Sequence, residues 1–181
     1  MTESIGEKSK YSFGFDLRGK IWSGKSSVRH FQQRKIKHAQ QKGGTCVSTG
    51  LSLLTGEAPE KINAQINTQD PVTWSNYLLK YGMKLAYCNT DFRRLRHYVR
   101  ELLDLDDLFV VCTYTPTNPN MIGKEPDESG WVCGSHFTLM HRDVVHDTRF
   151  TDSVLIQDYR DLDRYVKRIF RVVPSDNPRG L

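Results

Sequence analysis

The chain gives its clearest structural signal between Lys42 and Gly56, where it reads KGGTCVSTGLSLLTG. Two glycines break the chain just before Thr45, a residue type that caps helices, and apolar residues then recur at helical spacing as far as Leu54. The final glycine of the stretch stops the pattern. The stretch therefore predicts a helix that places Cys46 in its first turn.

Further helices and then strands are expected along the rest of the chain. We expect helices near 59–67, 73–81 and 91–103, the last with an apolar stripe at 3.6-residue spacing. A polar helix also fits residues 26–41, and the Pro/Asn/Gly-rich stretch 116–130 is expected to be a loop. The expected strands cover 83–88, 108–115, 136–140, 154–158 and 165–173. Helices that precede a mostly antiparallel sheet predict an α+β fold.

The composition indicates a globular protein with one domain and an appended arm. Of the 181 residues 38% are hydrophobic, and no apolar run approaches the roughly 20 residues that span a bilayer. We assign residues 1–35 to a basic N-terminal arm and residues 36–181 to the domain. The N-terminus lacks the apolar segment of a secretory signal peptide, so a cytoplasmic location is expected, with delivery by a non-classical secretion route left open.

The net charge of +5 comes from one segment of the chain. Residues 18–42 contain eight Lys or Arg residues and no acidic residue. Such a segment could contact an acidic partner or nucleic acid, but a run of charge is more often a solvated face. We therefore favour a solvated face for residues 18–42.

Cys46 is the best candidate for a catalytic nucleophile. The four cysteines, at positions 46, 88, 112 and 133, form no close CxxC pair and are interpreted as thiols. A thiol attacks as its thiolate, so a nucleophile needs a group that lowers its pKa, such as a helix N-terminus or an imidazolium. Cys46 has the first of these, because it lies in the first turn of the expected helix. Gln40 or Gln41 could add an amide donor for a reacting carbonyl oxygen.

The base for Cys46 must come from a distant part of the chain. His136 opens an expected strand directly after two small residues. Asp158 closes the next strong strand and would lie opposite His136 if 136–145 and 149–158 form a hairpin, where it could orient the imidazole. Asp147 takes this role if the hairpin is much tighter. We prefer Asp158, because the strand before it is the stronger one.

The order of these residues resembles that of the papain-like cysteine peptidases. Gln40 precedes Cys46 by the family's five-residue interval, Cys46 opens a helix, His136 opens a strand and Asp158 closes one. The similarity is nearest to bacteriocin-leader peptidases and to bacterial papain-like effectors. The resemblance implies a papain-like fold and a thiol hydrolase of peptide or isopeptide bonds in a protein or peptide substrate. It also implies a Cys-His-Asp triad with Gln40 as the oxyanion residue, without cofactor or metal.

Several alternative functions stay open. Deamidases and acyltransferases use the same fold and the same thioester chemistry, and a basic binding module would need no catalysis. The segment from Cys133 to His136 has a spacing seen in metal sites, but no second close pair completes a zinc site. The segment 19–26 matches the phosphate-loop pattern GxxxxGKS, which would bind a nucleotide, without the strand that normally precedes it.

Overall fold

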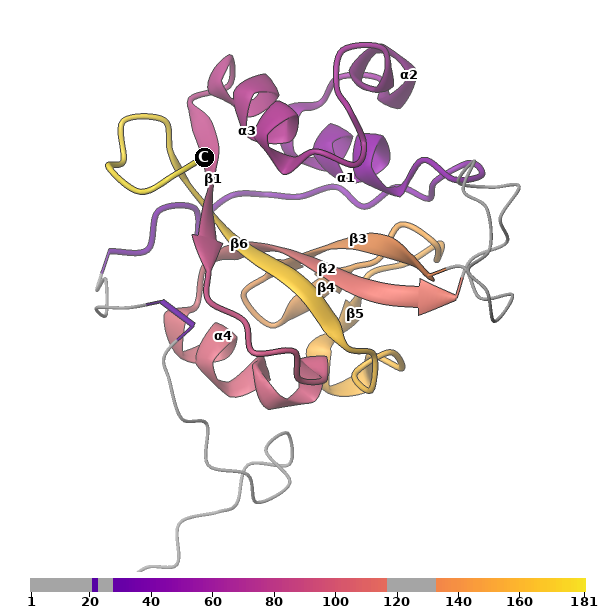
Figure 1. The fold of residues 1–181 in the computed structure, drawn as a ribbon, viewed down its shortest axis with the longest axis vertical. Coiled ribbons are helices and arrows are strands. Elements are labelled where there is room, and N and C mark those ends of the chain that lie inside the picture. The colour runs from indigo at the N-terminus through magenta and orange to yellow at the C-terminus, as the bar shows by residue number, and fades with distance from the viewer. Residues whose placement is uncertain (1–20, 23–27, 117–132) are drawn as a thin grey trace, which may run out of the picture.

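The protein has an α+β fold in which helices cover both faces of one antiparallel sheet. The computed structural model describes residues 21–22, 28–116 and 133–181. Three helices lie together on one face of the sheet, and a fourth lies on the other (Figure 1). The first three are α1 (Cys46–Thr55), α2 (Pro59–Asn63) and α3 (Pro71–Leu79), and the fourth is α4 (Val99–Leu105). The expected α+β class and the packing of N-terminal helices on a sheet are confirmed.

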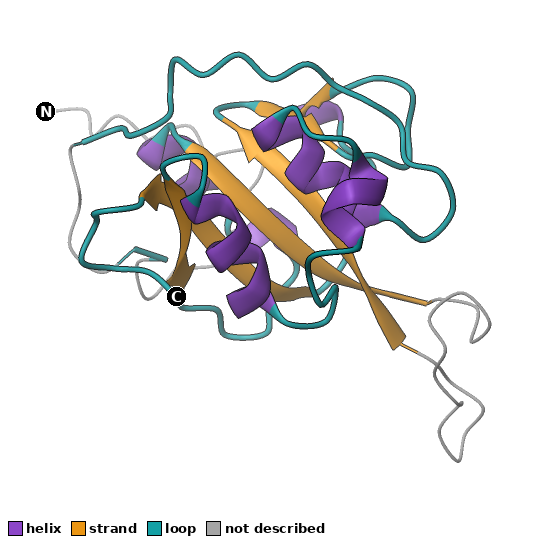
Figure 2. Cartoon of the chain, turned by 90° about the horizontal axis from the view of Figure 1, so that it is seen from above, coloured by secondary structure: helices purple, strands orange, loops and turns teal. Residues whose placement is uncertain are grey.

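Six strands form the sheet, in the order β1-β6-β2-β3-β4-β5, and all neighbours are antiparallel. Seen from above, helices lie over these strands (Figure 2). The centre of the sheet is the long pair β2–β3, in which Thr113 lies opposite His136. The strands are β1 (Met83–Cys88), β2 (Leu108–Pro116), β3 (Cys133–His141), β4 (Val144–His146), β5 (Val154–Leu155) and β6 (Val166–Pro174).

Alternation along β2 divides the hydrophobic core into two layers. Even-numbered residues, such as Val110 and Cys112, pack toward α1 and α3. Odd-numbered residues, such as Phe109 and Val111, pack toward α4. The sheet is therefore buried on both faces, as its largely apolar strands require.

Helix α1 begins and ends where the sequence predicts. It starts at Cys46 and is closed by Gly56 in the left-handed conformation, which glycine adopts without strain. The Thr45 hydroxyl does not cap the helix, because it donates to Lys42 O at 2.9 Å instead. Gly50 has no Cβ to separate the helix from β3, and a Cβ there would collide with the Phe137 ring. This close approach brings the start of α1 to the strand that carries His136.

Three local predictions differ from the structure. The stretch 91–103 is not one helix, because a 3-10 turn at Leu95–His97 precedes α4. The stretch 154–158 is a strand for only two residues and continues as a 3-10 turn, Ile156–Asp158. No helix forms within the described part of 26–41, residues 28–41. The expected loop at 116–130 lies outside the described residues except for its first position.

The segment before α1 is attached to the sheet through a buried ion pair. Asp107 and Arg171 are fully buried, and Arg171 Nε donates to Asp107 Oδ2 at 2.9 Å. Burial of two charges is tolerated when hydrogen bonds satisfy them. Asp107 Oδ1 accepts the Phe31 N–H at 2.8 Å, and Arg171 donates to Val28 O at 2.8 Å. Contacts of this kind fix residues 28–31 on the domain, while the division at residues 35 and 36 stays a prediction.

Candidate active site

The Cys46 thiol lies at the start of α1, where the helix meets β3. Backbone N–H groups of Val47 and Phe137 and the His136 side chain act on its sulfur as donors that favour the thiolate. The N–H groups of a first helical turn have no partner within the helix, so they are available to a negatively charged group. Three donors from two elements therefore converge on one half-buried sulfur.

His136 joins this thiol to a carboxylate. The imidazole is only 4% exposed, on a strand in the middle of the sheet. Its Nε2 donates to Asp147 Oδ1 at 2.6 Å, which leaves Nδ1 as the ring nitrogen that serves Cys46. The structure thus brings Cys46, His136 and Asp147 together in that order.

The preference for Asp158 as the partner of His136 is wrong. The hairpin turns at Arg142 and Asp143, so that β3 pairs with β4 and His141 lies opposite Val144. This is the tighter hairpin that favours Asp147. Asp158 is exposed on the 3-10 turn that follows β5.

Asp147 is held by three side chains. Its carboxylate, 1% exposed, accepts hydrogen bonds from His136, from the Tyr159 hydroxyl at 2.9 Å and from Arg149 Nη2 at 2.5 Å. The backbone N–H of Arg149 donates to it too, at 3.0 Å. Asp161 pairs with the same Arg149 nitrogen, Nη2. The polar neighbours of Asp147 therefore fix the carboxylate rigidly, which the sequence did not suggest.

The charges at the site favour a thiolate beside an imidazolium. Burial raises the pKa of Cys46, but hydrogen bonds from His136 and from two backbone N–H groups outweigh it, so that the pKa is lowered overall. Burial lowers the pKa of His136, but its bonds to Asp147 and Cys46 raise the pKa overall. Burial also opposes ionisation of Asp147, yet His136 and Arg149 hold its pKa far below the usual range.

Gln40 does not contact Cys46 in the structure. Its amide nitrogen donates to Arg149 O at 3.0 Å, and its side chain is exposed. Gln41 is half-buried, donates to Gly43 O at 2.7 Å and accepts from the Thr148 hydroxyl at 2.7 Å. Both glutamines thus attach the approach to α1 to the segment that follows Asp147. The role of Gln40 at an oxyanion stays a prediction.

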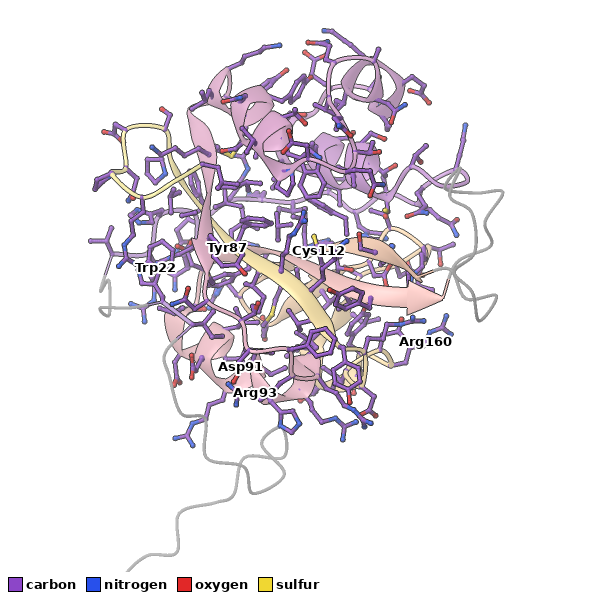
Figure 3. The ribbon with its side chains drawn as sticks, in the orientation of Figure 1. Trp22, Tyr87, Asp91, Arg93, Cys112 and Arg160 are labelled. Atoms are coloured by element: carbon purple, nitrogen blue, oxygen red, sulfur yellow. The ribbon has the colours of Figure 1, made fainter. Side chains whose placement is uncertain are left out.

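The other cysteines have surroundings that disfavour a thiolate. Cys88 and Cys112 are buried, and burial raises the pKa of each thiol to about 12. Cys112 lies in the interior of the molecule (Figure 3). The side chain of Cys133 lies outside the described residues.

The metal-site and phosphate-loop alternatives fall partly or mostly on residues outside the described part of the chain. Over 21–22, 28–116 and 133–181, no three His, Cys, Asp or Glu side chains gather as metal ligands would. The phosphate-loop match at 19–26 lies outside the described residues apart from Ile21 and Trp22, which are buried. Among the described helices, none is both long and apolar enough to cross a membrane.

Sequence reasoning did not identify Tyr159 and Arg149 as part of the site. Both residues hydrogen-bond Asp147. Because Asp158 was preferred as the carboxylate, the partners of Asp147 were not considered. A weak signal was present, because an Arg two residues after an Asp can fold back on it.

Neither a scan of protein families nor a search of curated proteins finds a match to this sequence.

Proposed function

We propose that the protein is a cysteine-dependent hydrolase of peptide or isopeptide bonds with a papain-like arrangement of Cys46, His136 and Asp147. One observation carries the proposal: a thiol at a helix start shares a buried imidazole with a fully hydrogen-bonded carboxylate. A nucleophile, its base and the group that orients the base are the parts that acyl transfer through a thioester needs.

The first half of the reaction forms an acyl-enzyme. The Cys46 thiolate attacks the carbonyl carbon of the substrate amide, and N–H groups at the start of α1, which have no partner within the helix, stabilise the developing oxyanion. The His136 imidazolium then gives its proton to the leaving amine, and the C–N bond breaks. Asp147 keeps the ring in the orientation that directs Nδ1 at the reacting atoms.

The second half returns the free enzyme. Neutral His136 takes a proton from water, whose oxygen attacks the thioester carbonyl. The carboxylic acid leaves, and Cys46 is released as a thiolate beside an imidazolium. An amine in place of water would make the product of an acyltransferase, and a side-chain amide in place of a peptide bond would make that of a deamidase.

Acylation by an activated ester tests the mechanism without knowledge of the substrate. p-Nitrophenyl acetate should give a burst of p-nitrophenolate, and mass spectrometry should find the acetyl group on Cys46. The Cys46→Ala protein should give no burst, while Cys88→Ala should behave as the wild type. Acetylation of another residue, or a burst that survives Cys46→Ala, would rule out the proposed mechanism.

A further inference from the structure

Asp147 shares its charge between two cations, His136 and Arg149. Its Oδ1 accepts a hydrogen bond from His136 Nε2 at 2.6 Å and another from Arg149 Nε at 3.2 Å. Its Oδ2 accepts from Arg149 Nη2 at 2.5 Å. A guanidinium this close to an imidazole disfavours the protonated ring, because like charges repel. On these contacts alone, Arg149 would weaken the hold of Asp147 on the His136 proton.

Asp161 brings a second carboxylate to the same arginine. Its Oδ2 accepts a hydrogen bond from Arg149 Nη2, the nitrogen that also binds Asp147. This nitrogen carries two protons, so it can donate to both carboxylates at once. The side chains of Arg149 and Asp161 are 25% and 15% exposed, so solvent screens the pair only in part. The charge of Arg149 is therefore divided between two anions.

A second arginine, Arg164, holds Asp161. Arg164 Nε lies 3.0 Å from Asp161 Oδ2, and Arg164 Nη1 donates to the Thr115 hydroxyl at 2.7 Å. Thr115, on β2, lies opposite Gly134, two residues before His136 on β3. The path of contacts thus starts on β3 and ends on the strand paired with it. Charges alternate in sign along this path, which we call the charge row: Cys46, His136, Asp147, Arg149, Asp161 and Arg164.

The carboxylates and the arginine in the middle of the charge row stay ionised near neutral pH. Burial opposes ionisation of Asp161, but the Arg149 guanidinium lowers its pKa overall. Burial lowers the pKa of Arg149, but its bonds to Asp147 and Asp161 raise the pKa overall. Tyr159, which also faces Asp147, stays neutral because burial and that carboxylate raise its pKa. The neighbouring His146 stays neutral too, since burial and nearby imidazoles lower its pKa to about 4.

We propose that Asp161 is a positioning residue for the reaction at Cys46: it neutralises Arg149 and so leaves the charge of Asp147 to the His136 imidazolium. Without Asp161, Arg149 acts on the imidazolium as an uncompensated cation. This inference rests on the proposed hydrolase function, because it assigns Asp161 to the thiolate–imidazolium pair on which that chemistry depends. It predicts that Asp161 and Arg149 affect the protonation of His136 in opposite directions.

NMR titration of His136 tests this role in a protein that cannot react. Proton–nitrogen spectra of full-length Cys46→Ala protein follow the ring through the pH range, and the signal that His136→Gln removes assigns it. In the Cys46→Ala background, Asp161→Asn should lower the midpoint by roughly half a pH unit. Arg149→Gln should raise it by roughly one pH unit, because this cation is nearer to the ring. The double variant removes both charges and should restore the midpoint to within about 0.2 pH unit.

The matched control is Asp163→Asn, which removes the same charge two positions further along the chain. Asp163 pairs with Arg94 and Arg96, and its side chain is 56% exposed. Solvent therefore screens its charge, and its removal should leave the His136 midpoint unchanged. Urea unfolding of each variant identifies any change that comes from a loosened fold.

Two results would contradict the proposal outright. One is an unchanged midpoint in Asp161→Asn, or a shift no larger than that in Asp163→Asn. The other is a lower midpoint in both Asp161→Asn and Arg149→Gln, which is what a purely structural role in holding Asp147 would give. The titration needs neither the Cys46 thiol nor a substrate, so it can succeed where the acetylation test fails. A failed titration likewise leaves acetylation of Cys46 standing.

Discussion

Cys46 and Cys112 border the same core but have opposite electrostatic surroundings. Cys46 stands at a helix start, where His136 and two backbone N–H groups lower its pKa against the effect of burial. Cys112 lies in the middle of β2, where burial raises its pKa to about 12. Cys46 is half-buried and Cys112 is buried, and burial acts to raise the pKa of both thiols, so burial alone does not decide which one ionises. The donors that face the sulfur make one thiol a candidate nucleophile and the other a packing residue.

Removal of each thiol should give the largest contrast. Cys46→Ala should lower the rate of ester or amide hydrolysis to the background, a loss of roughly 10⁶-fold, because no other group can form the thioester. Cys112→Ala should retain the rate and lower the free energy of unfolding by about 1–2 kcal/mol through lost packing. Steady-state kinetics and urea unfolding of both variants measure the two effects. A slow Cys112→Ala enzyme of normal stability would contradict this division of roles.

The two carboxylates should differ almost as much. Asp147→Ala should slow hydrolysis roughly 10²–10⁴-fold, since His136 loses both its orientation and a stabilising charge. Asp158→Ala should change the rate by less than about twofold, because the residue is exposed and does not hold the imidazole. The values of kcat/KM for the two variants show which carboxylate orients His136. If Asp158→Ala were the slower enzyme, the observed hairpin would not describe the active protein.

The depressed pKa of Asp147 should also appear in the stability of the fold. A carboxyl group whose pKa is lower in the folded state stabilises the protein above its unfolded pKa of about 3.8 and loses that contribution as the pH falls below it. The loss from one such group is about 1.4 kcal/mol per pH unit. Urea unfolding between pH 5 and pH 2 should therefore show a shallower decline for Asp147→Asn than for the wild type. Parallel declines would mean that Asp147 is not selectively stabilised as the carboxylate.

Tyr159 should make the smallest contribution among the groups that bind Asp147. Tyr159→Phe removes one hydrogen bond of 2.9 Å and leaves those from His136 and Arg149, so hydrolysis should slow roughly three- to tenfold. The control is Tyr87→Phe, which removes an exposed hydroxyl that meets Thr90 at 3.4 Å. Equal rates for the two variants would show that Tyr159 only fills space.

The helix start was predictable because its determinants are local. The glycines before Thr45 and the helical spacing after it lie within fifteen residues, and they place Cys46, the candidate nucleophile, at the helix start. The α+β class was predictable for a similar reason, since most strands are apolar runs bounded by polar segments. His136 followed from its place at the start of one such run, and the structure brings it to Cys46.

The carboxylate was not predictable because a short turn sets the hairpin register. In the turn between β3 and β4, Arg142 has a φ of 57°. A tight turn with a positive φ is usually marked in the sequence by a glycine, which is missing at this position. Contacts distant in sequence compensate, because Arg142 pairs with Asp106 at 3.1 Å and its N–H donates to Asp107 O at 2.8 Å. The local sequence around the turn cannot reveal contacts with distant residues. The choice of Asp158 rested instead on the apolar run that precedes it, and that choice was wrong.

The pH dependence of alkylation tests the central claim most directly, namely that Cys46 is held as a thiolate by His136 and the start of α1. Iodoacetamide should modify Cys46 first, as mapped by mass spectrometry, and its rate should stay high well below the pKa of about 8.5 of an ordinary thiol. Asp147→Asn should move the midpoint of that rate profile upward, because His136 loses the charge that keeps it protonated. Faster modification of Cys88, Cys112 or Cys133, or a Cys46 midpoint at the ordinary value in the wild type, would contradict the account.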